Sequence, residues 1–324
     1  MREKTLDMKN GFEKKLFIIG NGFDCAHGLK TSYDNFYKYL SRKDASLDEQ
    51  SLLDLLTDEL GVYEDEVNKV WSDLESLLGM VDFETEIEMT SEYYIDQNDD
   101  NTDKDTDYYD YQVIDNMLAK QFDVELLPSI FASWISTIDV IHAKPKGCFM
   151  KIIQGRFNKF LTFNYTRTLE NIYNVFLPMH IHGSIDEYGE ADGILVGHGN
   201  DKLKEYVYCA GDRNPLGELS SCSAIEECQN RARDMCNAWR KDVRSNLEKN
   251  IGFFQGIQDM RMIYSYGFSY GDVDMPYIKE IVDNLREQEK VQWFFESYNE
   301  VRNISYEKKI RGIGFKGGFG RFSI

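Results

Sequence analysis

The sequence lacks most of the features that mark secreted, membrane-spanning or nucleic-acid-binding proteins. Its 324 residues include six cysteines and no Cys-x-x-Cys pair, so a disulfide framework is excluded and no common zinc-site spacing occurs. No apolar stretch approaches the roughly 18 residues of a membrane span, and residues 1–14 lack the apolar segment of a signal peptide. Basic residues are few, 37 Lys and Arg against 56 Asp and Glu, and a net charge of −19 disfavours nucleic acid as a partner. We therefore expect a soluble cytoplasmic protein that binds no membrane.

Hydrophobic residues make up 42% of the chain and aromatic residues 14%, which is enough to fill a large core. We predict a single α/β domain over residues 1–324, interrupted by a helical and acidic insertion at about 44–145 and a second helical insertion at about 203–258. The first insertion contains twelve acidic residues and one basic residue between Asp82 and Asp110. A cation site is one interpretation of this stretch, but the calcium-loop spacing with its glycine is missing, which favours a solvated acidic loop.

The first strand and its turn organise the rest of the chain. An unbroken apolar run from Leu16 to Ile19 is typical of a central parallel strand that is buried on both faces. Gly20-Asn21-Gly22 follows, and a helix is expected from near Thr31-Ser32. Glycines at a strand end let a ligand approach backbone N–H groups, so the turn favours a nucleotide phosphate. A plain tight turn is the alternative, because the third glycine of the dinucleotide fingerprint is missing.

Further strands alternate with helices from residue 160 onward. They are expected at Phe160–Phe163, Met179–His182, Ile194–Val196, Arg261–Tyr266 and, as the last strand, Val291–Phe295. Strands alternating with helices predict a mostly parallel, Rossmann-like sheet flanked by helices. The glycine-rich residues 312–320 follow no clear strand, so we interpret them as a flexible tail or a partner contact.

Polar residues end these strands, although they are far apart in the sequence. Ligands of parallel sheets bind at the carboxyl ends of the strands, so these residues predict one binding site at that edge. The segments concerned are Gly20–Asp24, Asn164–Thr166, His182–Ser184, His198 and Gly267–Asp272.

Several of these segments resemble the signature of the bacteriophage abortive infection AbiH family. The motifs are Gly20–Asp24 with Ala26–Tyr33, Trp71–Glu75, Thr162–Thr166, His182–Ser184 and Tyr266–Ser269 with Asp272 and Asp274. The resemblance spans about residues 15–300 and implies a role in phage defence, with a phage-derived trigger of unknown nature and a homo-oligomer as a further expectation.

The order of these motifs is also similar, more distantly, to sirtuin-like NAD-binding domains. That similarity implies NAD as substrate or ligand, no metal, and Asn164 and His182 as the catalytic residues. It departs at Asn21 and Phe23-Asp24, where sirtuins have small residues, and in lacking the paired cysteines of the sirtuin zinc module. The implied cofactor-binding residues are Gly20, Asn21, Gly22, Phe23, Asp24, Gly183, Ser184, Gly267, Ser269 and Asp272.

Hydrolysis of NAD to nicotinamide and ADP-ribose requires an oriented water and a group that accepts its proton. An asparagine such as Asn164 can position the water, a histidine such as His182 can take the proton, and Asp24 could orient the histidine or bind a ribose hydroxyl. Helix capping is the simpler interpretation of Asn164, and also of Asp272 and Asp274. His180 alternates with His182 along its strand and is expected to face the other way.

Two other functions fit the same residues. The site could sense a nucleotide without catalysis and relay its state to a partner. Alternatively, Asp24, Asp272 and Asp274 could hold a divalent metal in a nuclease, although the negative net charge of the chain counts against this hypothesis.

Overall fold

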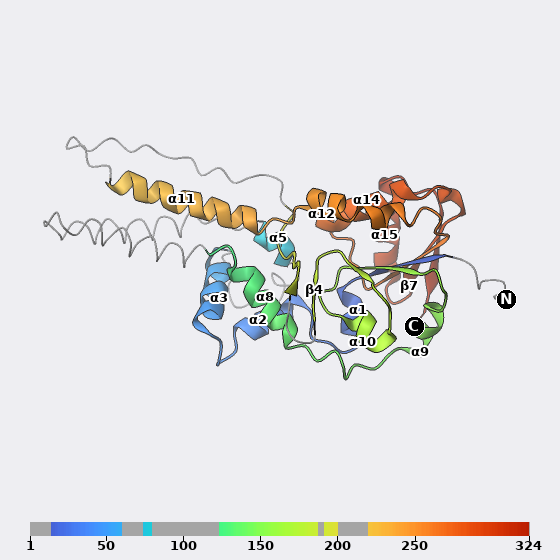
Figure 1. Cartoon of the computed structure of the whole chain (residues 1–324), viewed down its shortest axis with the longest axis horizontal. Coiled ribbons are helices and arrows are strands. Elements are labelled where there is room, and N and C mark those ends of the chain that lie inside the picture. The colour runs from blue at the N-terminus through green and yellow to red at the C-terminus, as the bar shows by residue number, and fades with distance from the viewer. Residues whose placement is uncertain (1–13, 60–73, 80–122, 187–190, 200–219, 324) are drawn as a thin grey trace, which may run out of the picture. The chain divides into compact units, whose positions relative to one another are not determined.

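A computed structural model of the chain describes residues 14–59, 74–79, 123–186, 191–199 and 220–323 (Figure 1). Its centre is a six-stranded sheet in the order β3-β2-β1-β6-β7-β8, and every neighbouring pair of strands is parallel. The predicted α/β, Rossmann-like class is therefore confirmed. The strands are β1 (Lys15–Ile19), β2 (Lys159–Thr162), β3 (Met179–His180), β6 (Met262–Tyr266), β7 (Gln292–Glu296) and β8 (Gly318–Phe322).

Helices follow most of the strands. Asp242 and Asn299 cap two of them, since their side chains accept the backbone N–H of Ser245 and of Arg302. The expected helix after Thr31-Ser32 is α2. The helices are α1 (Asn21–Ala26), α2 (Tyr33–Leu40), α3 (Leu47–Glu59), α5 (Leu74–Leu78), α8 (Leu126–Ser136), α9 (Gly147–Ile152), α10 (Thr168–Tyr173), α11 (Ser220–Ala238), α12 (Val243–Lys249), α13 (Ile251–Gln255), α14 (Met275–Asn284) and α15 (Glu300–Gly312), with short 3-10 turns η3 (Asp272–Asp274) and η4 (Gln288–Lys290).

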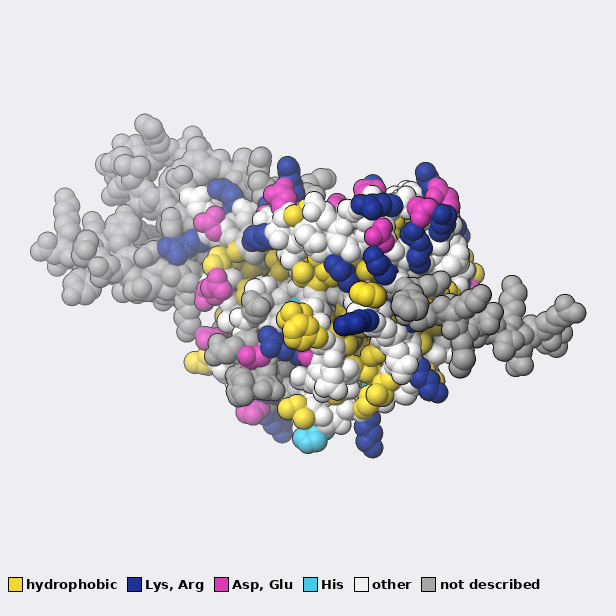
Figure 2. Space-filling view, turned by 45° about the vertical axis from the view of Figure 1, so that its right-hand side comes forward, with side chains coloured by type: hydrophobic (Ala, Val, Ile, Leu, Met, Phe, Trp, Pro, Cys, Tyr) yellow, Lys and Arg dark blue, Asp and Glu magenta, His cyan; other side chains and the backbone are white. Residues whose placement is uncertain are grey.

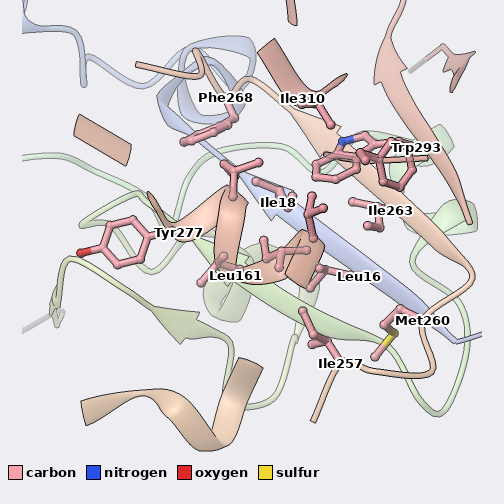
Figure 3. Close-up of a cluster of buried hydrophobic side chains, with 14 of the residues drawn as sticks. Leu16, Ile18, Leu161, Ile257, Met260, Ile263, Phe268, Tyr277, Trp293 and Ile310 are labelled. Carbon is pink, nitrogen blue, oxygen red and sulfur yellow. The ribbon is translucent and has the colours of Figure 1, made fainter. Parts of the chain in front are cut away.

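Strand β1 is buried on both faces because its side chains alternate between two hydrophobic cores. Leu16 and Ile18 pack into a core with residues of α13, α14 and α15, whereas Phe17 and Ile19 pack with residues of α1, α9 and α10. Figure 3 shows part of the first core, where Ile18 of β1 lies among side chains from neighbouring strands and helices. Each fully buried side chain of this kind stabilises the fold by about 1.5–3 kcal/mol. The apolar run predicted this position of β1 correctly.

The described chain divides into two compact units. The first comprises Met1–Asn35, Ala132–Leu195 and Asp242–Ile324 and holds the whole six-stranded sheet. The second comprises Phe36–Phe131 and Val196–Lys241, and its core includes a contact between Phe36 and Phe131, whose ring centroids are 5.4 Å apart. The predicted boundaries of the two insertions stay a prediction, and the acidic stretch from Asp82 to Asp110 lies outside the described residues.

The prediction of a strand at Ile194–Val196 is wrong. The backbone there is irregular, and Leu195 donates its N–H to the carbonyl of His182 (2.9 Å). The strand residues in this region are instead β4 (Ser184–Ile185) and β5 (Ala191–Asp192), which pair antiparallel as a separate two-stranded sheet. Strand β3 also ends earlier than expected, at His180, because a turn with Gly183 at φ +79° follows it.

The glycine-rich C-terminal residues form strand β8, so β7 is not the last strand. Gly318 and Gly320 lie beside the side chains of β7, where a Cβ on Gly320 would come within 2.7 Å of the Phe294 ring. The glycines thus make room for large neighbours. Arg321 fixes the strand through two hydrogen bonds to Glu300 of α15 (2.6 and 2.7 Å).

The charged side chains of one face and the hydropathy of the helices complete the description of the fold. On the face drawn in Figure 2, basic and acidic side chains are intermingled rather than separated by sign. Within the described ranges, no helix combines the length and the apolarity needed to cross a bilayer.

Candidate functional site

Three glycines bring the end of β1 against the end of β6. Gly20 donates its N–H to the carbonyl of Tyr266 (3.0 Å), and Gly22 donates to the carbonyl of Gly267 (2.8 Å). A Cβ on Gly20 would lie 2.6 Å from the Cα of Phe268, and a Cβ on Gly22 would lie 2.7 Å from the Cα of Gly267. Close backbone packing therefore requires glycine at these positions.

The same contacts bear on the predicted phosphate site. The N–H groups of Gly20 and Gly22 are used as just described, and the N–H of Phe23 donates to the carbonyl of Gly20 (2.9 Å). Helix α1 begins at Asn21, whose side chain is exposed. Two of these donors hold the ends of β1 and β6 together, and the third closes the turn at the start of α1. All three N–H groups are therefore already hydrogen-bonded within the protein.

Asp24 lies in α1 directly behind this turn and is almost fully buried, with 1% of its surface exposed. The hydroxyl of Thr166, which follows strand β2, donates to Asp24 Oδ2 at 2.5 Å, and it lies 2.9 Å from the hydroxyl of Thr168. Oδ1 of Asp24 has no hydrogen-bond partner within the described part of the chain. Burial raises the pKa of Asp24 to about 6, against the lowering effect of the two threonine hydroxyls and of Asn164.

Asn164 lies beside Asp24 and is 6% exposed. Its carbonyl accepts a hydrogen bond from His180 Nδ1 (2.9 Å). Its side chain lowers the pKa of Asp24, yet neither amide atom completes a hydrogen bond with any described residue. A buried polar atom without a partner costs about 1–3 kcal/mol, so these atoms are where a polar ligand would gain most. Asn164 does not cap α10, whose N-cap residue is Arg167.

His182 lies in an aromatic enclosure and is 2% exposed. Its ring centroid is 5.3 Å from that of Phe163 and 5.8 Å from that of Tyr277. Its Nε2 lies 3.2 Å from Oδ1 of Asp274, without the geometry of a hydrogen bond. Asp274 precedes α14 but its side chain makes no capping hydrogen bond, so it faces the histidine instead of acting as the expected cap.

The two predicted catalytic residues therefore have different neighbours. Asn164 is grouped with Asp24 and the threonines, while His182 is grouped with Asp274 and with aromatic rings that belong to the core of α14. No hydrogen bond joins their side chains. His180 contacts Glu170 of α10 through Nε2 (2.8 Å), so its ring has other neighbours than that of His182. Strand alternation does not explain this difference, because residues two apart in a strand lie on the same face. The reason is instead that β3 ends at His180 and His182 lies in the turn that follows.

The remaining predicted residues are distributed around these two groups. Ser184 is buried and lies 3.3 Å from two nitrogens of Arg167. Ser269 is exposed, and Asp272 is 94% exposed with an ion pair to Lys309 (2.8 Å). Gly183 and Gly267 both have positive φ and shape the turns after β3 and β6. His198 belongs to the other compact unit, where its Nε2 lies 3.0 Å from the carbonyl of Cys236.

Thr166 and Thr168 belong to the site, although sequence analysis assigned them no role. They follow Asn164 at a strand end, which is the signal that could have indicated them. Among the residues described, no group of three or more His, Cys, Asp or Glu side chains could hold a metal ion. The three carboxylates of the nuclease hypothesis are therefore not gathered in one place.

A known protein family matches most of the chain. The family described as Bacteriophage abortive infection AbiH matches residues 16–297, which is most of the chain and contains the whole of this site. No curated protein and no solved structure matches the chain.

Proposed function

Since the chain belongs to the bacteriophage abortive infection AbiH family, we propose that it defends the cell by binding NAD and hydrolysing it to nicotinamide and ADP-ribose. Loss of NAD in the cytoplasm would stop metabolism in an infected cell before the phage completes its cycle. The observation that carries the proposal is the buried amide of Asn164, which lies beside the carboxyl of Asp24 and whose nitrogen and oxygen complete no hydrogen bond with the residues that the structure describes.

The position of these groups fits a nucleotide substrate. They follow parallel strands β1 and β2, and ligands of open parallel sheets bind at the carboxyl ends of such strands. An amide and a carboxyl oxygen suit the hydroxyl groups of a ribose, because they supply one donor and two acceptors. Arg167, in the same loop as Asn164, offers a cation that could bind the pyrophosphate. The N–H groups of Gly20 and Gly22 are less suited to this task, because they are already hydrogen-bonded within the protein.

The main task of the protein in this reaction is to position the water and the substrate. Nicotinamide leaves NAD as a neutral group and the ribosyl centre becomes cationic, so an enzyme must hold a water against that centre and accept its proton. Asn164 would hold the water. The sequence assigns proton acceptance to His182, whose Nε2 faces Asp274.

The test follows the release of nicotinamide from NAD by chromatography, with and without a lysate of phage-infected cells as the source of the trigger. Wild type is compared with Asn164→Ala and His182→Ala, and Asn171→Ala is the matched control because Asn171 is an exposed asparagine of α10. We expect release by wild type and by the control, and loss of release in Asn164→Ala. Binding of NAD without turnover under both conditions would favour the nucleotide sensor. A wild-type protein that shows no binding and no turnover would refute the proposal.

A further inference from the structure

We propose that Asp24 is the proton acceptor of the site, with Thr166 and Thr168 holding its carboxyl in position toward the nucleophile beside Asn164. This assignment rests on the proposed hydrolysis and names the group that takes the proton in it. Sequence analysis had given Asp24 only a supporting role.

The hydrogen bonds of Asp24 leave one oxygen available. Oδ2 accepts the hydroxyl of Thr166 at 2.5 Å, and that hydroxyl lies 2.9 Å from Thr168 Oγ1, so the orientation of the carboxyl is fixed. Oδ1 has no partner among the described residues. A carboxylate held through one oxygen presents the lone pairs of the other oxygen in a constant direction, which suits a general base.

The amide of Asn164 is a buried neighbour of Asp24. It is within hydrogen-bonding reach of the Asp24 carboxyl and so lowers the pKa of that group, although neither of its polar atoms meets the full geometry of a hydrogen bond to a described residue. A hydroxyl placed between the two side chains would accept a hydrogen bond from the amide nitrogen and donate its proton to Oδ1 of Asp24. Asn164 and Asp24 together would therefore orient and deprotonate the same oxygen atom.

Burial and the neighbouring polar groups together set the pKa of Asp24. Burial raises its pKa to about 6, whereas Thr166, Thr168, Asn164 and the more distant His180 lower it. His180 is itself paired with Glu170 (2.8 Å), and Cys25, the neighbour of Asp24 in α1, has a pKa raised by burial. A base with a pKa near 6 is mostly ionised at neutral pH and still accepts a proton readily.

His182 is less suited to the same task. Its Nε2 faces Asp274 at 3.2 Å, and its ring is enclosed by Phe163 and Tyr277 on the side of the sheet that carries α14. Asn164 lies instead with Asp24, next to α1. His182 would therefore help to position the aromatic rings of Phe163 and Tyr277 and would not act as the base.

The proposed step balances. The oxygen of a water forms a bond to C1′ of the ribose, and one of its protons passes to Oδ1 of Asp24. The bond between C1′ and the nicotinamide nitrogen breaks, and its electron pair leaves with neutral nicotinamide. Asp24 then returns the proton to solvent, so no oxidant, reductant or further reactant is required.

The decisive experiment measures the pH profile of nicotinamide release for wild type, Asp24→Asn and Asp24→Glu. Asp283→Asn is the control, because Asp283 is an exposed aspartate of α14 paired with Lys279. We expect wild type and control to lose about tenfold in kcat/KM for each pH unit below about 6, as Asp24 becomes protonated. Asp24→Asn should lower kcat by roughly 100- to 10,000-fold with its fold intact by circular dichroism, and Asp24→Glu should restore part of the rate.

Failure of this assignment is distinguishable from failure of the hydrolase proposal. An active Asp24→Asn variant with the wild-type pH profile would overturn the role of Asp24 and leave the hydrolase standing. A wild type that releases no nicotinamide, with the lysate present, and binds no ADP-ribose by calorimetry would overturn both. Carbon-13 NMR of the aspartate carboxyls gives a readout without turnover: a signal lost in Asp24→Asn should titrate near pH 6, and a midpoint near 4 would contradict the assignment.

Discussion

Gly22 donates its backbone N–H to the carbonyl oxygen of Gly267 at 2.8 Å, across 245 residues of sequence. This bond joins the first turn of α1 to the end of β6, and Gly20 adds a second bond to Tyr266 at 3.0 Å. The glycines after β1 and the glycine after β6 therefore form one backbone joint between the ends of these two neighbouring strands. Asp24 is buried behind that joint, so the geometry of the site depends on it.

Gly267→Ala should destabilise the protein by about 3 kcal/mol or more. The added Cβ would lie 2.1 Å from the backbone nitrogen of Phe23, and the residue has φ +66°, which strains any side chain. Gly271→Ala is the matched control, because its Cβ would meet nothing closer than Ser269 Oγ at 3.9 Å and should change stability by no more than about 0.5 kcal/mol. Urea unfolding measures both, and equal stabilities of the two variants would contradict the packing argument.

Asp24 should make the folded state less stable as the pH rises from about 4 to about 6. Its pKa is raised from 3.8 to about 6 on folding. The unfolded chain therefore releases this proton at lower pH than the folded chain, and the unfolded state is stabilised relative to the folded state over that interval. Asp24→Asn carries no such proton. Its stability relative to wild type should therefore increase by roughly 2 kcal/mol between about pH 4.5 and pH 7 in urea unfolding. The stability of the control Asp283→Asn relative to wild type should not rise with pH in this way. If the stability of Asp24→Asn relative to wild type is also independent of pH, burial does not raise the pKa of Asp24.

The buried ion pair between Lys241 and Glu75 should be costly to break from one side. Lys241 Nζ lies 2.6 Å from Glu75 Oε1, and the lysine side chain is fully buried. Glu75→Gln removes a carboxylate that is 2.6 Å from a fully buried ammonium group, and should destabilise the unit by about 3 kcal/mol. The double variant Lys241→Met with Glu75→Leu removes both charges and should recover most of that loss in thermal unfolding. A double variant that is as unstable as the single one would mean that packing, and not charge, accounts for the effect.

Ser265 and Tyr270 should act redundantly as acceptors for one buried N–H. Trp293 Nε1 lies 3.0 Å from Ser265 Oγ and 3.1 Å from the hydroxyl of Tyr270, and the two hydroxyls are hydrogen-bonded to each other. Tyr270→Phe or Ser265→Ala alone leaves the indole one acceptor, so each should cost about 1 kcal/mol. The double variant leaves the N–H unsatisfied and should cost about 1 kcal/mol more than the sum, as a double-mutant cycle in urea measures. Simple additivity would argue against the shared acceptor.

Hydrophobic runs were sufficient to predict most of the sheet, because a buried parallel strand has a local pattern. Strands β1, β2, β6 and β7 follow such runs, and the site was expected at their carboxyl ends. Strand β8 was missed because Gly318 and Gly320 have low strand propensity. They are explained by side chains of the neighbouring strand β7, Gln292 beside Gly318 and Phe294 beside Gly320. The strand expected at Ile194–Val196 was wrong because an apolar run of three residues does not determine its backbone partner.

The positions of the candidate site residues after strands were predictable, but their contacts were not. Asn164 and Asp24 could be named from their places after strands, whereas the bond from Thr166 to Asp24 joins residues 142 positions apart and depends on the pairing of β1 with β2. The enclosure of His182 by Phe163 and Tyr277 likewise depends on where α14 packs. Such contacts carry no signal in a single sequence.

The position of β1 in the sheet has a consequence for synthesis of the protein. Its hydrogen-bonding partners are β2 and β6, and β6 begins about 240 residues after β1 ends. At roughly 5–20 residues per second, a ribosome needs about 12–50 s to cover that distance. During this time the most hydrophobic strand of the nascent chain lacks one of its two neighbours, so we expect chaperones that shield apolar segments to raise the yield of folded protein.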